Sequence, residues 1–195
     1  MKILHPLNYQ APISSGFGWR NLGSGSHFHA ALDIAAPVGT WVRASLPGKV
    51  IKVNATNSAG YADGYDSVEA GVNGSNVEID HGNGFFTRYA HLSNSNVSVG
   101  QKVNVGQWIG RVGTKGTGAH LHFEFKGNPG YYGGDFSKAY DPEPLFTFNL
   151  NEVGGSSKGW LGGVAAIVAL TGVGVAAYYN FDGKKIKQDF KKLAA

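Results

Sequence analysis

Two histidines, His120 and His122, lie one residue apart in the apolar run Gly118-Ala119-His120-Leu121-His122-Phe123-Glu124. Because a β-strand repeats every two residues, both imidazoles are expected on one face of a sheet, with Leu121 and Phe123 on the other. Imidazoles so placed can bind a metal ion or transfer protons. The chain has seven histidines and no cysteine, so any metal must be held by His, Asp or Glu side chains.

Two further segments carry residues of the same chemistry. His29 and Asp33 are four residues apart, and the following Pro37 favours a loop that enters a strand over a helix. The third segment is Tyr89-Ala90-His91-Leu92. Each motif is weak evidence alone, but together, in one domain with few histidines, they predict a metal site. A hydrolytic zinc site typically takes three ligands from His, Asp and Glu and keeps one position for water.

Short strands must position these residues. Thirty glycines, 15% charged residues and strand-like runs between turn clusters predict an all-β, antiparallel domain over residues 1–150. A long surface loop is expected over residues 54–74, which are rich in Asn, Ser, Gly, Ala and Asp. The expected strands cover residues 41–44, 48–53, 76–80, 85–90, 103–112 and 119–125.

The C-terminal part differs in composition. Residues 151–159 have the Gly- and Ser-rich composition of a linker, and residues 160–179 contain no charged side chain. A single transmembrane helix is therefore expected over residues 160–180, followed by a Lys-rich tail over 181–195. A buried hairpin or core helix is the alternative interpretation of residues 160–180.

Charge and N-terminal composition bear on partners and location. Residues 1–158 carry 12 Lys and Arg against 11 Asp and Glu, so no nucleic-acid partner is expected for the main domain. The lysines after residue 180 would lie on the cytoplasmic side, which would put the main domain outside. No secretory signal is evident at the N-terminus. One hypothesis that reconciles the two is a membrane protein delivered in the internal membrane of a bacteriophage particle.

The joint pattern resembles the lysostaphin/LytM type of zinc endopeptidase, which cuts peptide bridges in bacterial peptidoglycan. The resemblance covers about residues 13–147. It rests on Phe17-Gly18-Trp19-Arg20, His29-x-x-x-Asp33, Ala35-Ala36-Pro37-Val38-Gly39-Thr40, Tyr89-Ala90-His91-Leu92 and His120-Leu121-His122-Phe123-Glu124. One departure is Ala31, which stands where the family commonly has glycine.

The resemblance implies a role for each of five residues. His29, Asp33 and His122 would bind Zn²⁺, and His91 and His120 would be the catalytic pair. A neutral histidine beside the metal can take a proton from water, and a protonated one can stabilise the developing oxyanion or protonate the leaving amine. The partner implied is peptidoglycan, and the reaction is hydrolysis of its peptide cross-links for cell-wall penetration or lysis by a phage.

Several other residues have less definite interpretations. His27 competes with His29 as a ligand and is expected to be a rim residue, His81 a polar turn residue, and His5 part of a mobile N-terminus. Glu124 shares the strand face of His120 and His122 and is expected either to orient one of them or to meet solvent. Two alternative functions stay open: a noncatalytic wall-binding or activator protein, and a structural virion membrane protein on a hydrolase-like fold.

Overall fold

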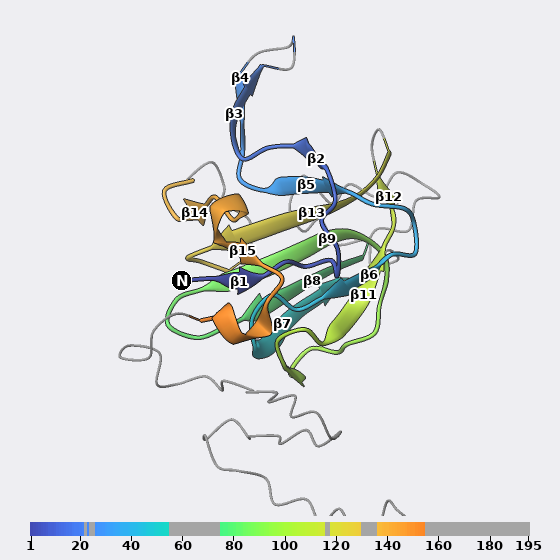
Figure 1. The fold of residues 1–195 in the computed structure, drawn as a ribbon, viewed down its shortest axis with the longest axis vertical. Coiled ribbons are helices and arrows are strands. Elements are labelled where there is room, and N and C mark those ends of the chain that lie inside the picture. The colour runs from blue at the N-terminus through green and yellow to red at the C-terminus, as the bar shows by residue number, and fades with distance from the viewer. Residues whose placement is uncertain (22, 24–25, 55–74, 116–117, 130–135, 155–195) are drawn as a thin grey trace, which may run out of the picture.

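The computed structural model describes residues 1–21, 23, 26–54, 75–115, 118–129 and 136–154 (Figure 1). Fifteen strands and two short 3-10 helices occur in these ranges. They are β1 (Ile3–Leu4), β2 (Ile13–Ser15), β3 (Gly18–Asn21), β4 (Ser26–His29), β5 (Leu32–Ala35), β6 (Trp41–Arg43), β7 (Gly48–Asn54), β8 (Ser75–Asp80), β9 (Phe86–Ser95), β10 (Lys102–Val103), β11 (Trp108–Val112), β12 (Thr114–Lys115), β13 (Gly118–Lys126), β14 (Ala139–Tyr140), η1 (Glu143–Leu145), β15 (Phe146–Thr147) and η2 (Leu150–Glu152).

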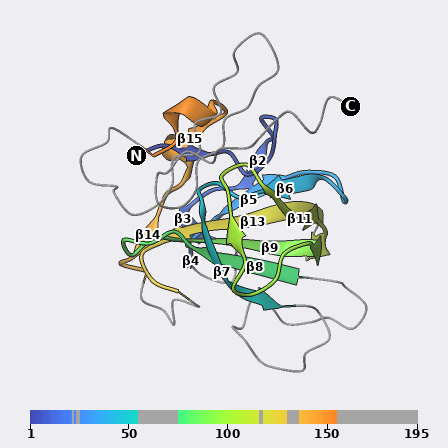
Figure 2. The same ribbon diagram turned by 90° about the horizontal axis from the view of Figure 1, so that it is seen from below.

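One large antiparallel sheet organises the domain. Its strand order is β10-β7-β8-β9-β13-β5-β2, with β11 joined to β6 and β9, and with β12 and β14 paired to β13 (Figures 1 and 2). The β3–β4 hairpin projects away from this sheet, and β1 and β15 form a separate parallel pair. The all-β architecture is thus confirmed for the described residues, as are most of the expected strand segments. The expected segment 103–112 consists instead of the end of β10 and the whole of β11, with a turn over residues 104–107 between them.

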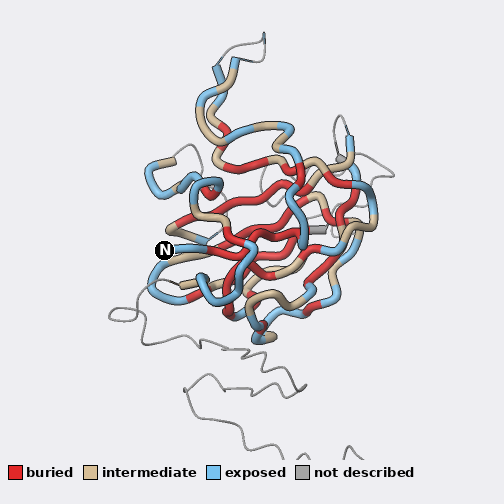
Figure 3. Tube along the Cα trace, in the orientation of Figure 1, coloured by how far each residue is buried: buried red, intermediate tan, exposed pale blue. Residues whose placement is uncertain are grey.

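Strand β13 separates the hydrophobic core from a polar face. Leu121, Phe123 and Phe125 alternate onto one face and are buried in the core. The buried stretches concentrate in the centre of the sheet, whereas the β3–β4 hairpin is largely exposed (Figure 3). The intervening residues His120, His122, Glu124 and Lys126 therefore share the opposite face, as the period of two requires.

Strand β9 changes partner at its midpoint. Residues from Phe86 to Ala90 pair with β13, and residues from Leu92 to Ser95 pair with β11. His91 lies between the two ladders in the left-handed region, with φ 61°. The register with β8 also shifts in this stretch, since Val77 opposes Tyr89 and Ser75 opposes Leu92. An extra residue of this kind is a β-bulge, which redirects the side chains that follow the last regular pair.

Residues 55–74 and 155–195 lie outside the described residues, and with them lie nearly all of the expected surface loop, most of the expected linker and all of residues 160–180. In the part of the chain that is described, no helix is both long enough and apolar enough to cross a membrane. The transmembrane helix and the Lys-rich tail therefore stay predictions.

Candidate metal centre

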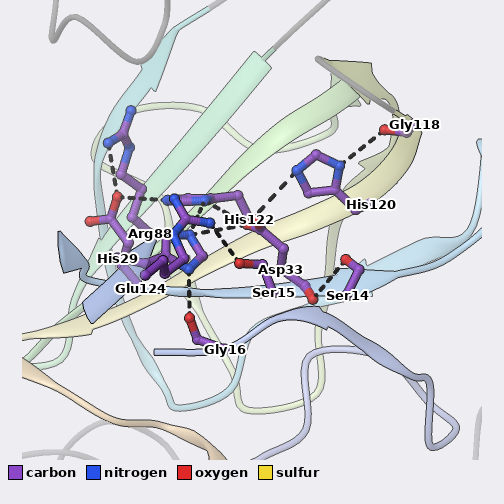
Figure 4. A network of polar contacts seen from close by, with 11 residues as sticks. Ser14, Ser15, Gly16, His29, Asp33, Arg88, Gly118, His120, His122 and Glu124 are labelled. Carbon is purple, nitrogen blue, oxygen red and sulfur yellow. Dashed lines mark hydrogen bonds and ion pairs between the residues drawn. The ribbon is translucent and has the colours of Figure 1, made fainter. Parts of the chain in front are cut away.

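Three side chains from two distant parts of the sequence, His29 with Asp33 and His122, converge beside the middle of β13. Nδ1 of His122 lies 2.9 Å from Oδ1 of Asp33, and Nε2 of His29 lies 3.4 Å from the same oxygen (Figure 4). The two facing imidazole nitrogens are also 3.4 Å apart. Each residue thus directs one potential ligand atom to a common point.

The sheet register explains this convergence. Asp33 lies directly opposite His122 in the β5–β13 ladder, so both side chains stand on the same face. His29 is the last residue of β4 and is buried, and the short connection to β5 returns the chain to the same place. The expectation that no helix joins His29 to Asp33 and that Asp33 stands on a strand is confirmed, but His29, expected on a loop, ends strand β4.

Hydrogen bonds on the far side of each ring determine which nitrogen faces the cluster. Nδ1 of His29 is 2.9 Å from the carbonyl oxygen of Gly16, so that nitrogen carries the proton and donates it. Nε2 of His122 is 3.3 Å from Oε1 of Glu124 and donates in the same way. When each ring is neutral, the nitrogen that faces Asp33 is then the unprotonated one, as a metal ligand must be.

The donor set fits a zinc ion. Two imidazole nitrogens and a carboxylate oxygen are usual zinc ligands, and three protein ligands leave a fourth position open. Ligand atoms about 2.0–2.1 Å from a tetrahedral zinc lie about 3.3 Å from one another. The three measured separations of 2.9, 3.4 and 3.4 Å are close to that spacing.

Electrostatics at the cluster favour the forms that hold a cation. Burial raises the pKa of Asp33, but hydrogen bonds from His122 and His29 outweigh it and place the pKa well below its usual range. Burial lowers the pKa of His122, whereas hydrogen bonds to Asp33 and Glu124 raise it by more, so the net shift is upward. A divalent ion would compete with the protons of these rings, and metal binding is then expected to release protons.

Two more histidines flank the cluster. Nε2 of His120 is 3.8 Å from Oδ1 of Asp33, and its Nδ1 donates to the carbonyl oxygen of Gly118 over 3.0 Å. The ring of His91 lies 4.8 Å from that of His120 and 5.3 Å from that of His122, measured between centroids. All five residues singled out in the sequence are therefore close together.

Glu124 connects the cluster to a buried group of charges that sequence reasoning missed. Its Oε1 accepts from Arg88 Nη1 over 3.0 Å, and its Oε2 lies 3.0 Å from Lys126 Nζ. Lys126 Nζ is also 3.2 Å from Oε1 of Glu78. Of the two expectations for Glu124, orientation of a histidine agrees with this geometry and contact with solvent does not, since the residue is 5% exposed.

The remaining histidines lie elsewhere. His27 is exposed on β4 and does not belong to the converging group. His81 begins the turn after β8, as expected, but it is buried, with Nδ1 bonded to the Pro47 carbonyl and Nε2 to the Thr87 hydroxyl. His5 is also buried and stacks on Phe148, so the expectation of a mobile segment there is wrong.

An antiparallel β-domain that presents a His, Asp and His cluster with two adjacent histidines has the fold and site of a metallopeptidase. The family model described as peptidase family M23 matches residues 27–133. The chain therefore belongs to peptidase family M23, a family of zinc metallopeptidases.

Named relatives and solved structures agree with this assignment. The chain is 39% identical over 132 residues to the peptidoglycan DD-endopeptidase ShyA of Vibrio cholerae. This match covers 64% of this chain and 27% of ShyA. It is 34% identical over 135 residues to the glycyl-glycine endopeptidase ALE-1 of Staphylococcus capitis, 67% of this chain and 32% of ALE-1. The matched region thus spans about a third or less of these relatives.

The catalytic domain of lysostaphin from Staphylococcus simulans is similar in structure, with a TM-score of 0.54 and 30% identity. The similarity covers 69% of this chain and 90% of that domain. The lysostaphin-like fold expected from the sequence is confirmed.

Proposed function

We propose that this chain is a zinc-dependent endopeptidase that hydrolyses peptide cross-links of bacterial peptidoglycan. The observation that supports it most directly is the convergence of His29, Asp33 and His122 beside two further histidines. The names of the relatives support the substrate class, because ShyA is a peptidoglycan endopeptidase.

In this proposal, His29 Nε2, Asp33 Oδ1 and His122 Nδ1 hold the metal. When bound, Zn²⁺ lowers the pKa of a coordinated water and polarises the scissile carbonyl. The hydrogen bonds from His29 to Gly16 and from His122 to Glu124 keep both rings oriented toward Asp33.

His120 and His91 act on protons and charge. The bond from Nδ1 of His120 to Gly118 leaves Nε2 unprotonated and directed to the cluster, where it can take a proton from the attacking water. His91, whose ring lies beside those of both His120 and His122, can donate a hydrogen bond to the developing oxyanion or a proton to the leaving amine. A noncatalytic wall-binding or activator role is less consistent with a site in which all three proposed metal ligands and both proposed catalytic histidines are present.

The reaction is tested with the full chain on purified peptidoglycan. Soluble fragments are expected to appear, to disappear with a chelator and to return with added zinc, and their masses identify the bond cut. The relatives suggest two bonds to compare, the D,D-cross-link and the glycyl-glycine bridge. Binding to the wall without release of fragments, by a protein with zinc bound, would favour the noncatalytic alternative.

The proposal extends to a membrane tether and to a phage particle as the place of action. The twenty uncharged residues 160–179 and the lysines that follow support the tether. Co-sedimentation of the full chain with lipid vesicles, lost when residues 155–195 are removed, is the expected result. Detection of the protein in purified phage particles would support the virion location, whereas its presence only in uninfected host membranes would refute it.

A further inference from the structure

Four buried charged side chains form one network on the metal-binding face of the sheet. Glu124 on β13 lies opposite Arg88 on β9, and Arg88 lies opposite Glu78 on β8. Lys126, two residues after Glu124, reaches both carboxylates. The side chains of all four are at most 6% exposed.

The network is balanced, with two carboxylates and two cations. A buried charge is costly unless it is paired and hydrogen-bonded, so each member restricts the placement of the others. Glu124 is held between Arg88 Nη1 on one oxygen and Lys126 Nζ on the other. With a guanidinium on one oxygen and an ammonium on the other, its carboxylate is ionised and fixed in orientation.

An ionised carboxylate can only accept hydrogen bonds. The group that Glu124 Oε1 meets on the metal-centre side is Nε2 of His122, at 3.3 Å (Figure 4). That nitrogen must therefore carry a proton, which leaves Nδ1 as the nitrogen available to a metal.

We propose that Glu124, fixed by Arg88 and Lys126, is a positioning residue that keeps the proton of His122 on Nε2 and so presents Nδ1 to the zinc ion. This inference rests on the proposed function through the assignment of His122 as a ligand. The network thus contributes to metal affinity through the hydrogen bond between His122 Nε2 and Glu124 Oε1. Glu78 contacts Lys126 at the far end of the network and is not expected to orient His122.

The first test is the protonation state of His122 in the zinc-loaded full chain. Nitrogen–proton correlation spectra of the histidine rings are expected to show a proton on Nε2 of His122 and none on Nδ1. A ring with its proton on Nδ1 and the metal on Nε2 would overturn the inference. This measurement needs no variant.

The second test compares Glu124→Gln with Glu78→Gln by competition for Zn²⁺ against a chromophoric chelator. Both changes remove one buried negative charge that contacts the same lysine, so a purely structural network predicts similar effects. The positioning role predicts that Glu124→Gln weakens zinc affinity about 10–100-fold, while Glu78→Gln changes it less than about threefold. Equal losses in the two variants, or no loss in Glu124→Gln, would contradict it.

Peptidoglycan hydrolysis by the wild-type chain separates this inference from the proposed function. Hydrolysis with unchanged zinc affinity in Glu124→Gln would refute the positioning role and leave the enzyme intact. Weakened zinc affinity in Glu124→Gln, together with no hydrolysis by the wild type, would refute the proposed endopeptidase activity and leave the positioning role of Glu124 supported.

Discussion

His122 and Asp33 lie directly opposite each other on adjacent antiparallel strands, and Nδ1 of His122 is 2.9 Å from Oδ1 of Asp33. Eighty-nine residues separate them in the chain. The contact therefore exists only when β5 and β13 pair in this register, since a slip of one residue would move the imidazole to the core face. The geometry of the proposed metal centre therefore depends directly on the sheet register.

Asp33→Asn is expected to weaken zinc binding more than about 100-fold, a larger loss than orienting partners of ligands usually cause. Asparagine keeps the size of the side chain but removes the charge that faces the two imidazoles. Competition with a chelator measures the affinity, and Asp141→Asn, a change at an exposed position, is the control. Near-normal affinity in Asp33→Asn would exclude Asp33 as a ligand.

His120→Ala is expected to lower turnover about 10²–10⁴-fold, the usual range for loss of a general acid or base. Zinc content should stay at the wild-type level, because the proposed ligands are other residues. Metal analysis and fragment release on the same preparation distinguish a proton-transfer role from ligation. A variant that loses its zinc would show instead that His120 is a ligand.

Gly113→Ala is expected to impair catalysis by moving His91. A Cβ at residue 113 would lie 2.8 Å from the carbonyl oxygen of His91 and 2.7 Å from the backbone nitrogen of Ser93. Both are backbone atoms, so β9 must shift at the point where His91 stands in its left-handed conformation. Fragment release per zinc-loaded, folded molecule is the measurement, and a loss of about tenfold or more is expected.

The control for Gly113→Ala is Gly48→Ala. There the new Cβ would meet backbone and side chains of residues 79–81, at the other end of the sheet. This variant is expected to lose stability and keep its turnover per folded molecule. An equal loss of turnover in the two variants would mean that general destabilisation, rather than displacement of His91, explains the effect.

His81 is expected to make stability depend on pH. Burial lowers its pKa from 6.5 to about 4 in the folded protein, although the bond to Pro47 and the charge of Asp80 oppose the shift. Between pH 4 and 6.5 the unfolded chain binds more protons at His81 than the folded protein does. The free energy of unfolding is therefore highest above about pH 6.5 and decreases as the pH falls toward 4. The difference corresponds to about 3 kcal/mol.

Denaturant unfolding of the zinc-free protein at several pH values checks this dependence without a contribution from metal release. His81→Gln should be less stable than the wild type at pH 7 and should show a flatter dependence between pH 6.5 and 4. Parallel curves for the two proteins would mean that His81 does not supply the pH dependence.

The sequence was sufficient to predict that His120, His122 and Asp33 share a site, because a strand period of two and a few rare residue types determine that much. The motifs and the family resemblance also placed His91 in this site, and its ring does lie beside those of His120 and His122, but they did not predict how the backbone brings it there. Regular alternation would put His91 on the same face as the buried Tyr89, that is toward the core, and would leave Ala90, which lies opposite His122, on the metal-binding face. The bulge that resolves this conflict depends on β9 pairing with β13 and then β11, which no local pattern reveals.

The buried charges were missed for a related reason. Glu124 and Lys126 alternate with Phe123 and Phe125, which is the usual pattern of a strand with one solvent-exposed face. Only the tertiary structure shows that Arg88 and Glu78 pair with them and that the face is covered. The burial of His5 and His81 was not predicted, because polar residues near turns or chain ends are usually exposed.

The parallel pairing of Ile3 with Phe146 and of Leu4 with Thr147 brings the first and last strands of the domain side by side. The amide of Gly154 adds a bond to the carbonyl of Lys2. A domain whose first and last residues are adjacent can be inserted into a loop of another protein without separating the two ends of that loop. The same adjacency makes the domain a candidate for circular permutation, in which its two ends are joined and new termini are placed in an exposed turn.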